Sequence, residues 1–148
     1  VGLRTRLFLP DMLKLERAYI MNLGSIASFY PIPYKIVYAG SKSFIFSFSR
    51  ALKEELRHTG VRVSVLCPGP IMTNQEVIQR IRRGGFWAKL SAMQPSKMAQ
   101  IAIDQMMKGN AVIIPGRVNR FFKRASSVVP TFIKQKILVR KFNVEEKI

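Results

Sequence analysis

Three side chains that can move a proton stand at defined intervals near the start of the sequence. Ser25 precedes Tyr38 by thirteen positions, and Lys42 follows Tyr38 by four. Residues four apart share one face of a helix, so the Lys42 ammonium would neighbour the Tyr38 phenol. A nearby positive charge lowers a phenol's pKa from its usual value of about 10. With a serine hydroxyl to hydrogen-bond a carbonyl oxygen, the set suits protonation of a developing alkoxide, as in hydride transfer to a carbonyl.

Each feature alone has a plain structural explanation. A tyrosine and a lysine four positions apart occur often on helices, and a serine can merely cap a turn. The prediction of a catalytic set therefore depends on whether the chain brings Ser25 to Tyr38 and Lys42.

Local patterns predict a strand before Ser25 and a helix that carries Tyr38. Residues 19–23 form a short apolar run, which is typical of a buried strand. Residues 36–58 lack proline and repeat apolar side chains at helical spacing, with Gly60 as a C-cap. The helix is apolar on more than one side, which favours packing against a partner there.

A second strand is predicted over residues 61–66, and it stops before Pro68. Strands that alternate with long helices indicate a parallel sheet. Ligands in such sheets bind beyond the carboxyl ends of the strands. Ser25 lies just past the first strand, and Tyr38 and Lys42 lie in the first turns of the joining helix, so the topology predicts one site at this edge.

The remaining segments continue the alternation of helix and strand. The sequence therefore predicts an α/β fold in one domain over residues 1–148, with 117–148 as a basic, apolar C-terminal helical extension. The predicted segments are a helix over 2–16 that contains Pro10, a loop over 29–34, a mobile basic segment over 74–92, a helix from an N-cap at Ser96 to Gly109, a strand over 111–114, and one or two helices over 117–142 broken at Pro130.

Three motifs resemble those of the short-chain dehydrogenase/reductase family. Tyr38-Ala39-Gly40-Ser41-Lys42 resembles its Tyr-x-x-x-Lys motif, and Asn22-Leu23-Gly24-Ser25 is similar to its catalytic serine segment. Pro68-Gly69-Pro70-Ile71-Met72-Thr73 resembles its Pro-Gly-x-x-x-Thr stretch. The motifs occur in the family's order, and the resemblance covers nearly the whole chain. It implies the C-terminal part of a Rossmann-like, doubly wound parallel sheet with flanking helices.

The resemblance implies an oxidoreductase that interconverts a carbonyl and an alcohol with NAD or NADP. Tyr38 would be the acid-base catalyst, and Ser25 would orient the substrate carbonyl. Lys42 would lower the pKa of the tyrosine and hold the nicotinamide ribose hydroxyls. The basic composition favours NADP mildly over NAD.

The same resemblance assigns residues that line the cofactor and substrate sites. Pro68 and Gly69 would line the nicotinamide pocket, with the Ile71 backbone and the Thr73 hydroxyl near the carboxamide. The 74–92 segment matches the family's substrate-binding loop. Its Phe86 and Trp87 would cover an apolar small-molecule substrate, although a tryptophan there is equally compatible with core packing.

Other parts of the family pattern are absent from this sequence. The Gly-rich Thr-Gly-x-x-x-Gly-x-Gly turn, the Asn-Asn-Ala-Gly stretch and the residue that selects NAD or NADP do not occur. The family's catalytic Asn would fall just ahead of Val1. We therefore interpret the chain as a C-terminal portion that by itself binds dinucleotide weakly and is inactive, with an open sheet edge for self-association.

The formal net charge of +17 raises alternative functions. It comes from 25 Lys and Arg against 8 Asp and Glu. The basic residues are spread out without zinc-finger spacing or an RNA-binding signature, so nucleic acid is a disfavoured partner. The first alternative is a non-catalytic basic module that binds an anionic surface, and the second is a truncated family member that acts in dimerisation. The 117–142 region could also contact a membrane peripherally through Phe121, Phe122, Val128 and Val129.

The few remaining reactive residues have plain interpretations. Cys67 is predicted to be a small buried residue, and with one cysteine and one histidine no internal disulfide or cysteine-based metal cluster can form. His58 is predicted to stabilise a helix end. No apolar run reaches the roughly 18 residues of a membrane span, so a cytoplasmic location is the default. The apolar 36–58 helix predicts a homo-oligomer.

Overall fold

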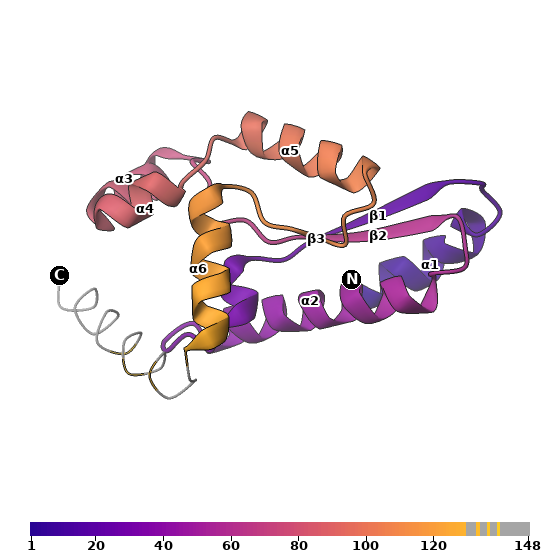
Figure 1. Cartoon of the computed structure of the whole chain (residues 1–148), viewed down its shortest axis with the longest axis horizontal. Coiled ribbons are helices and arrows are strands. Elements are labelled where there is room, and N and C mark those ends of the chain that lie inside the picture. The colour runs from indigo at the N-terminus through magenta and orange to yellow at the C-terminus, as the bar shows by residue number, and fades with distance from the viewer. Residues whose placement is uncertain (130–132, 134–135, 137–138, 140–148) are drawn as a thin grey trace.

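A three-stranded parallel sheet forms the centre of the computed structural model, which describes residues 1–129, 133, 136 and 139. The strands are β1 (Ala18–Leu23), β2 (Val61–Leu66) and β3 (Val112–Ile113), in the order β1-β2-β3. All pairings are parallel, and helices connect the strands (Figure 1). The predicted α/β fold with a parallel sheet is confirmed.

Helices cover both faces of this sheet, as Figure 1 shows, with α5 on one side and α1 and α2 on the other. Their bounds are α1 (Gly2–Met12), η1 (Ile26–Phe29), a 3-10 helix, α2 (Ile36–Glu55), α3 (Gln75–Arg83), α4 (Gly85–Ser91), α5 (Pro95–Met107) and α6 (Arg117–Val128).

The central strand β2 contributes to a hydrophobic core on each face. Val61 and Val63 are buried with Leu52 of α2, and Leu9 of α1 packs against this cluster. Leu66 belongs to a second cluster, which contains Met98, Ala102 and Ile113. Since successive strand residues point to opposite faces, one apolar strand can anchor both helical layers.

The segment after β2 differs from its prediction. Residues 74–92 were expected to be mobile with one or two helical turns, but they form α3 and α4. Val77 and Ile81 lie one helical turn apart on α3, and Ile81 is buried. An amphipathic helix needs only a narrow apolar stripe, so a polar composition does not exclude a packed helix.

Two predicted helix caps are also wrong. The helix that begins at Pro95 has Gln94 as its N-cap, with proline in the first turn, so Ser96 lies inside the helix. The helix α2 ends at Glu55, with Leu56 as its C-cap, so Gly60 caps nothing. The predicted break at Pro130 lies outside the described residues.

Gly60 instead allows two loops to cross closely. A Cβ atom at this position would collide with the carbonyl oxygen of Glu16, in the loop that leads into β1. The carbonyl of Gly60 accepts a hydrogen bond from the Ala18 amide at 3.1 Å. Glycine at this position therefore lets the starts of β1 and β2 come into register.

In the part of the chain that the structure describes, no helix combines the length and apolarity that crossing a membrane requires.

Replacing Gly60 with alanine should lower the free energy of unfolding by about 1–3 kcal/mol, because the added methyl group meets rigid backbone. Gly40→Ala is the matched control, since a Cβ there meets nothing within 4 Å. Because alanine suits a helix interior better than glycine, the control should gain about 0.5–1 kcal/mol. Urea unfolding of the full-length protein measures both, and equal stability in the two variants would contradict the role of Gly60.

Candidate active site

A cavity of about 690 Å³ lies at the carboxyl ends of β1 and β2. All seven residues that were predicted to act in catalysis or in cofactor binding line it, and they come from the segments after two strands and from α2. They are Ser25, Tyr38, Lys42, Pro68, Gly69, Ile71 and Thr73. The tertiary structure thus brings the predicted residues to one cavity.

The two strand ends are held together beyond the sheet itself. Leu23 pairs with Leu66 at the end of the β1–β2 ladder. The Gly24 amide donates to the Leu66 carbonyl at 2.8 Å, and the Ile26 amide donates to the Pro68 carbonyl at 3.0 Å. These bonds continue the strand pairing and put Ser25 beside Pro68.

Ser25 has a structural role in the fold and also lines the cavity. It is buried, and its Oγ accepts a hydrogen bond from the Ala27 amide at 3.1 Å, which caps η1. A hydroxyl oxygen that accepts a bond keeps its own hydrogen to donate. Ser25 therefore caps the helix and also presents a donor to the cavity.

Tyr38 and Lys42 project from the first turns of α2 into the same cavity. The Lys42 ammonium lies 5.8 Å from the centroid of the Tyr38 ring, which is 49% exposed. Its Nζ also donates to the carbonyl oxygen of Leu23 at 3.0 Å. The end of β1 thus holds the ammonium beside the phenol.

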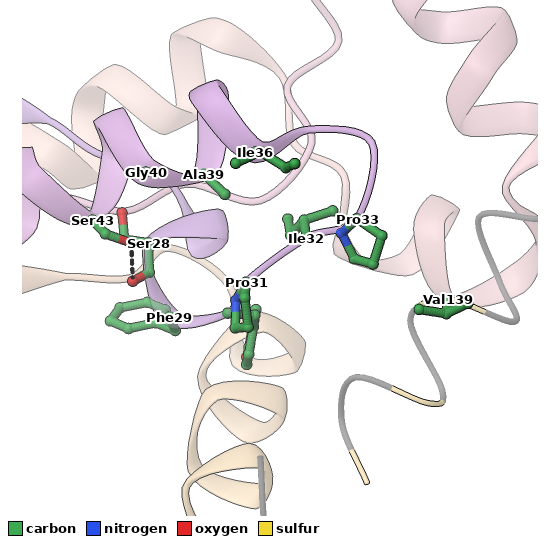
Figure 2. Close-up of a pocket in the computed structure, with 11 residues that line it drawn as sticks. Ser28, Phe29, Pro31, Ile32, Pro33, Ile36, Ala39, Gly40, Ser43 and Val139 are labelled. Atoms are coloured by element: carbon green, nitrogen blue, oxygen red, sulfur yellow. Dashed lines mark hydrogen bonds between the residues drawn. The ribbon is translucent and has the colours of Figure 1, made fainter. Parts of the chain in front are cut away.

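Ser28 is a positioning residue that the sequence reasoning missed. Its Oγ accepts from the Ser25 amide at 3.3 Å and donates to the Lys42 carbonyl at 2.9 Å. Ser43 of α2 donates in return to the Ser28 carbonyl at 3.0 Å (Figure 2). These bonds join the serine segment to α2 and so fix the distance between Ser25 and Tyr38.

Asn119 of α6 is a second residue that the sequence did not reveal. It is 3% exposed, and its Nδ2 donates to the carbonyl oxygens of Pro115 and Ser91 at 2.9 and 3.1 Å. Its amide group would overlap a Cβ at Gly69, so glycine is needed for this contact. Asn119 thereby ties α4 and the segment before α6 to the cavity wall at Gly69.

The wall formed by α3 and α4 is apolar, although its residues differ from those predicted. Val77, Ile81 and Ala88 line the cavity. Phe86, which was expected to cover the substrate, is 69% exposed and does not line it. The side chain of Trp87 lies outside the part of the chain that the structure describes.

A separate apolar pocket of about 650 Å³ adjoins the start of α2 on its other side. Figure 2 shows Phe29, Pro31, Ile32 and Pro33 along the loop that leads into the helix, with Ile36 at the helix start. This pocket contains none of the three predicted catalytic residues.

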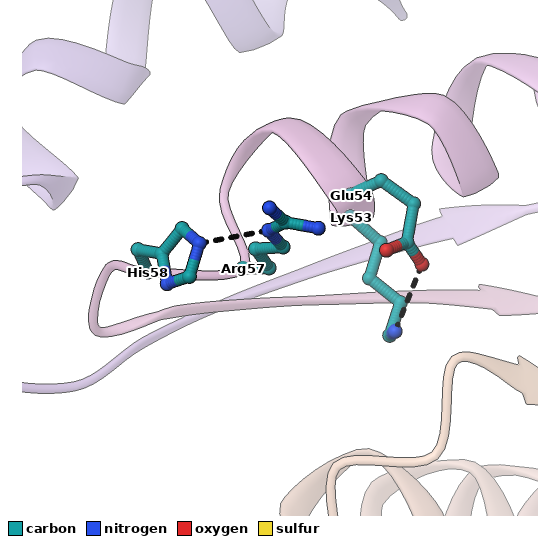
Figure 3. A network of polar contacts seen from close by, with 4 residues as sticks. All are labelled: Lys53, Glu54, Arg57 and His58. Atoms are coloured by element: carbon teal, nitrogen blue, oxygen red, sulfur yellow. Dashed lines mark hydrogen bonds and ion pairs between the residues drawn. The ribbon is translucent and has the colours of Figure 1, made fainter.

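Cys67 and His58 do not take part in the site. Burial raises the pKa of the Cys67 thiol to about 11, so the cysteine is the predicted inert core residue. His58 follows α2, and its Nε2 accepts from Arg57 Nε at 2.8 Å (Figure 3). It thus contacts a side chain, not the carbonyls of the helix end. Among the described residues, no three His, Cys, Asp or Glu side chains form a group that could hold a metal ion.

The comparison with protein families agrees with these motifs. The family model described as short chain dehydrogenase matches residues 2–82, which include Ser25, Tyr38 and Lys42. The chain belongs to the short-chain dehydrogenase family. Family membership supports the resemblance that the motifs indicated.

Curated relatives extend the match beyond that range. A probable NADP-dependent dehydrogenase of Haemophilus influenzae is 45% identical over 104 residues, which are 67% of this chain and 41% of that protein. Estradiol 17-beta-dehydrogenase 11 of Mus musculus is 31% identical over 117 residues, 67% of this chain and 39% of that protein. The chain therefore spans less than half the length of these two relatives.

Solved structures of the family share the fold. The structure described in work on 7beta-hydroxysteroid dehydrogenase stereoselectivity superposes with a TM-score of 0.75 at 19% identity. The superposition covers 93% of this chain and 52% of that one. The Rossmann-like fold of the short-chain dehydrogenases is thus confirmed for nearly all of the chain.

Replacing Ser28 with alanine should lower the free energy of unfolding by about 1–3 kcal/mol, because the Ser25 amide and the Lys42 carbonyl lose their partner. Ser47→Ala, on the exposed side of α2, is the control and should change it by less than about 0.5 kcal/mol. Thermal and urea unfolding of the full-length protein compare the two. A Ser28 variant as stable as the control would show that this contact does not hold η1 to α2.

Proposed function

We propose that this chain forms the catalytic half of an NAD(P)-dependent oxidoreductase that interconverts a carbonyl and an alcohol. The observation that carries the proposal is the convergence of Ser25, Tyr38 and Lys42 on one cavity, with the lysine ammonium 5.8 Å from the tyrosine ring centroid. Membership of the short-chain dehydrogenase family supports it.

Each of the three side chains has a task in the proton transfer. Ser25 donates a hydrogen bond to the substrate carbonyl oxygen and so orients it. Tyr38 gives its phenolic proton to that oxygen as negative charge develops there, and takes it back in the reverse direction. The Lys42 ammonium stabilises the negative charge left on the tyrosine oxygen.

The residues that follow the carboxyl end of β2 are our candidates for binding the nicotinamide end of the cofactor. Pro68 and Gly69 line the cavity beside Ser25, and Ile71 and Thr73 continue the same wall. The 70–73 segment is braced, because the Met93 amide donates to the Pro70 carbonyl at 3.0 Å. When bound, the cofactor supplies or accepts the hydride. Lys42 reaches the same cavity and is our candidate for binding the ribose hydroxyls.

NADP is the cofactor that we favour over NAD. The basic composition suits the additional phosphate of NADP. The Haemophilus influenzae relative, a probable NADP-dependent dehydrogenase, supports the same choice.

The substrate that fits the cavity best is a small apolar ketone or alcohol. Ile26 of η1 and Val77, Ile81 and Ala88 of the α3–α4 wall surround the polar groups. Such a lining excludes water around the reacting carbonyl, which strengthens the hydrogen bond from Ser25.

We also propose that the protein self-associates through the α1–α2 face. The helix α1 buries none of its residues, and it exposes Leu3 and Leu7 by 73% and 65%. On α2, Phe44 is 59% exposed and stacks on Phe48. Several large apolar side chains exposed on neighbouring helices are typical of an interface. The cytoplasmic location and the membrane contact of residues 117–142 stay predictions.

Replacing Tyr38 with phenylalanine should lower turnover of an apolar ketone by about 100- to 10,000-fold, because the proton donor is lost. NADPH binding, measured by fluorescence titration of the full-length protein, should persist. Lys42→Ala should weaken both turnover and binding. Tyr19→Phe on β1 is the control, since Tyr19 does not line the cavity. Full turnover by the Tyr38 variant would exclude it as the acid.

Replacing Phe44 with aspartate should shift the full-length protein toward a smaller oligomer, because a carboxylate would be buried in the proposed interface. Sedimentation velocity measures the change. Ile103→Asp, at a position on α5 that is 52% exposed, is the control and should leave the oligomer intact. An unchanged sedimentation coefficient for the Phe44 variant would remove α2 from the interface.

A further inference from the structure

A second polar cavity lies at the outer edge of the sheet, away from the predicted catalytic residues. It has a volume of about 330 Å³ and is lined by ten residues from α2, β3, α6 and the end of the α5 segment. Four of the ten are cationic and none is acidic. We call these four, Arg50, Arg120, Lys123 and Arg124, the basic cluster.

The basic cluster is assembled by packing between distant helices. Arg120, Lys123 and Arg124 are three and four positions apart, so they share one face of α6. Arg50 comes from α2. The Lys123 ammonium lies 5.9 Å from the centroid of the Phe29 ring, which contacts Phe46 of α2 edge-on at 5.0 Å. These contacts hold α6 against η1, which in turn packs on α2, with the cations lining one cavity.

The three arginines of the basic cluster, Arg50, Arg120 and Arg124, are not paired with acids among the described residues. Ion pairs join Lys14 to Asp11 and Lys53 to Glu54, and neither pair involves the basic cluster. Within the described part of the chain, no carboxylate lies at ion-pair distance from the three arginines of the cluster. Cations gathered around one cavity repel one another, and a bound anion offsets this repulsion because it attracts each of them.

The side chains that line this cavity determine which kind of anion it can bind. A guanidinium presents a planar fork of donors that matches phosphate oxygens two at a time. Gln105 adds an amide, whose oxygen is taken by Asn110 Nδ2 at 2.7 Å, so its NH₂ group is left as a donor. We propose that this cavity binds the phosphate groups of a small phosphorylated molecule. The site shares no lining residue with the candidate active site, so it does not depend on the proposed function.

The test is calorimetric titration of the full-length protein with pyrophosphate at a fixed chloride concentration. The cavity variant carries Arg50→Gln, Arg120→Gln and Arg124→Gln. The control variant carries Arg4→Gln, Arg62→Gln and Arg82→Gln, which remove the same charge from exposed positions outside the cavity. All six arginines are exposed, so both variants should fold.

The cavity variant should bind pyrophosphate about tenfold more weakly or worse, because charge-assisted hydrogen bonds are lost, and the control should stay within about twofold of the parent. The rise in the parent's melting temperature with pyrophosphate should disappear in the cavity variant alone. Equal losses in both variants would mean that net charge alone attracts the anion, which overturns the proposal. Binding to phosphatidic acid vesicles without binding to pyrophosphate would overturn it as well.

Discussion

The parallel pairing of β1 with β2 up to their last residues is the constraint on which the site depends. Leu23 faces Leu66, and the hydrogen bonds from Gly24 and Ile26 continue the pairing past the strands. Parallel strands end at the same edge of a sheet, so the serine segment and the Pro68 segment must emerge side by side. A slip in register would separate them.

The helix between these strands adds the other half of the site. It starts at the edge where β1 ends, and its first turns carry Tyr38 and Lys42. One backbone carbonyl, that of Leu23, holds the ammonium at the strand end. The hydroxyl of Ser28 joins the serine segment to the helix backbone. The geometry of the site therefore depends on a few hydrogen bonds between elements that otherwise pack together through apolar side chains.

Three surfaces of the molecule differ in their polarity and charge. The α1–α2 face exposes several large apolar side chains, and the candidate active site has an apolar wall around a few polar groups. The cavity beside β3 is lined by four cations. A net charge of +17 does not by itself indicate where an anion binds. The packing of the helices decides where an anion can bind, because it brings a few of the many exposed arginines to one cavity.

The sequence by itself determined the features that depend on short-range periodicity. Tyr38 and Lys42 had to share a helical face, the strands followed from apolar runs, and their alternation with helices required a parallel sheet. Cys67 was predicted to be buried because a free cysteine behaves as a small apolar residue. The family motifs then named the residues that line the cavity.

Only the tertiary structure decided the contacts between segments far apart in the chain. Ser28 bonds to Lys42 across 14 residues and Asn119 to Ser91 across 28, and no local pattern marks either pair. In the sequence Gly60 resembled a helix cap. In the structure its lack of a side chain lets the backbone of its loop pass close to the backbone at Glu16. The physical reason is that propensity and periodicity act within a few residues, whereas such contacts exist only after the strands and helices have packed.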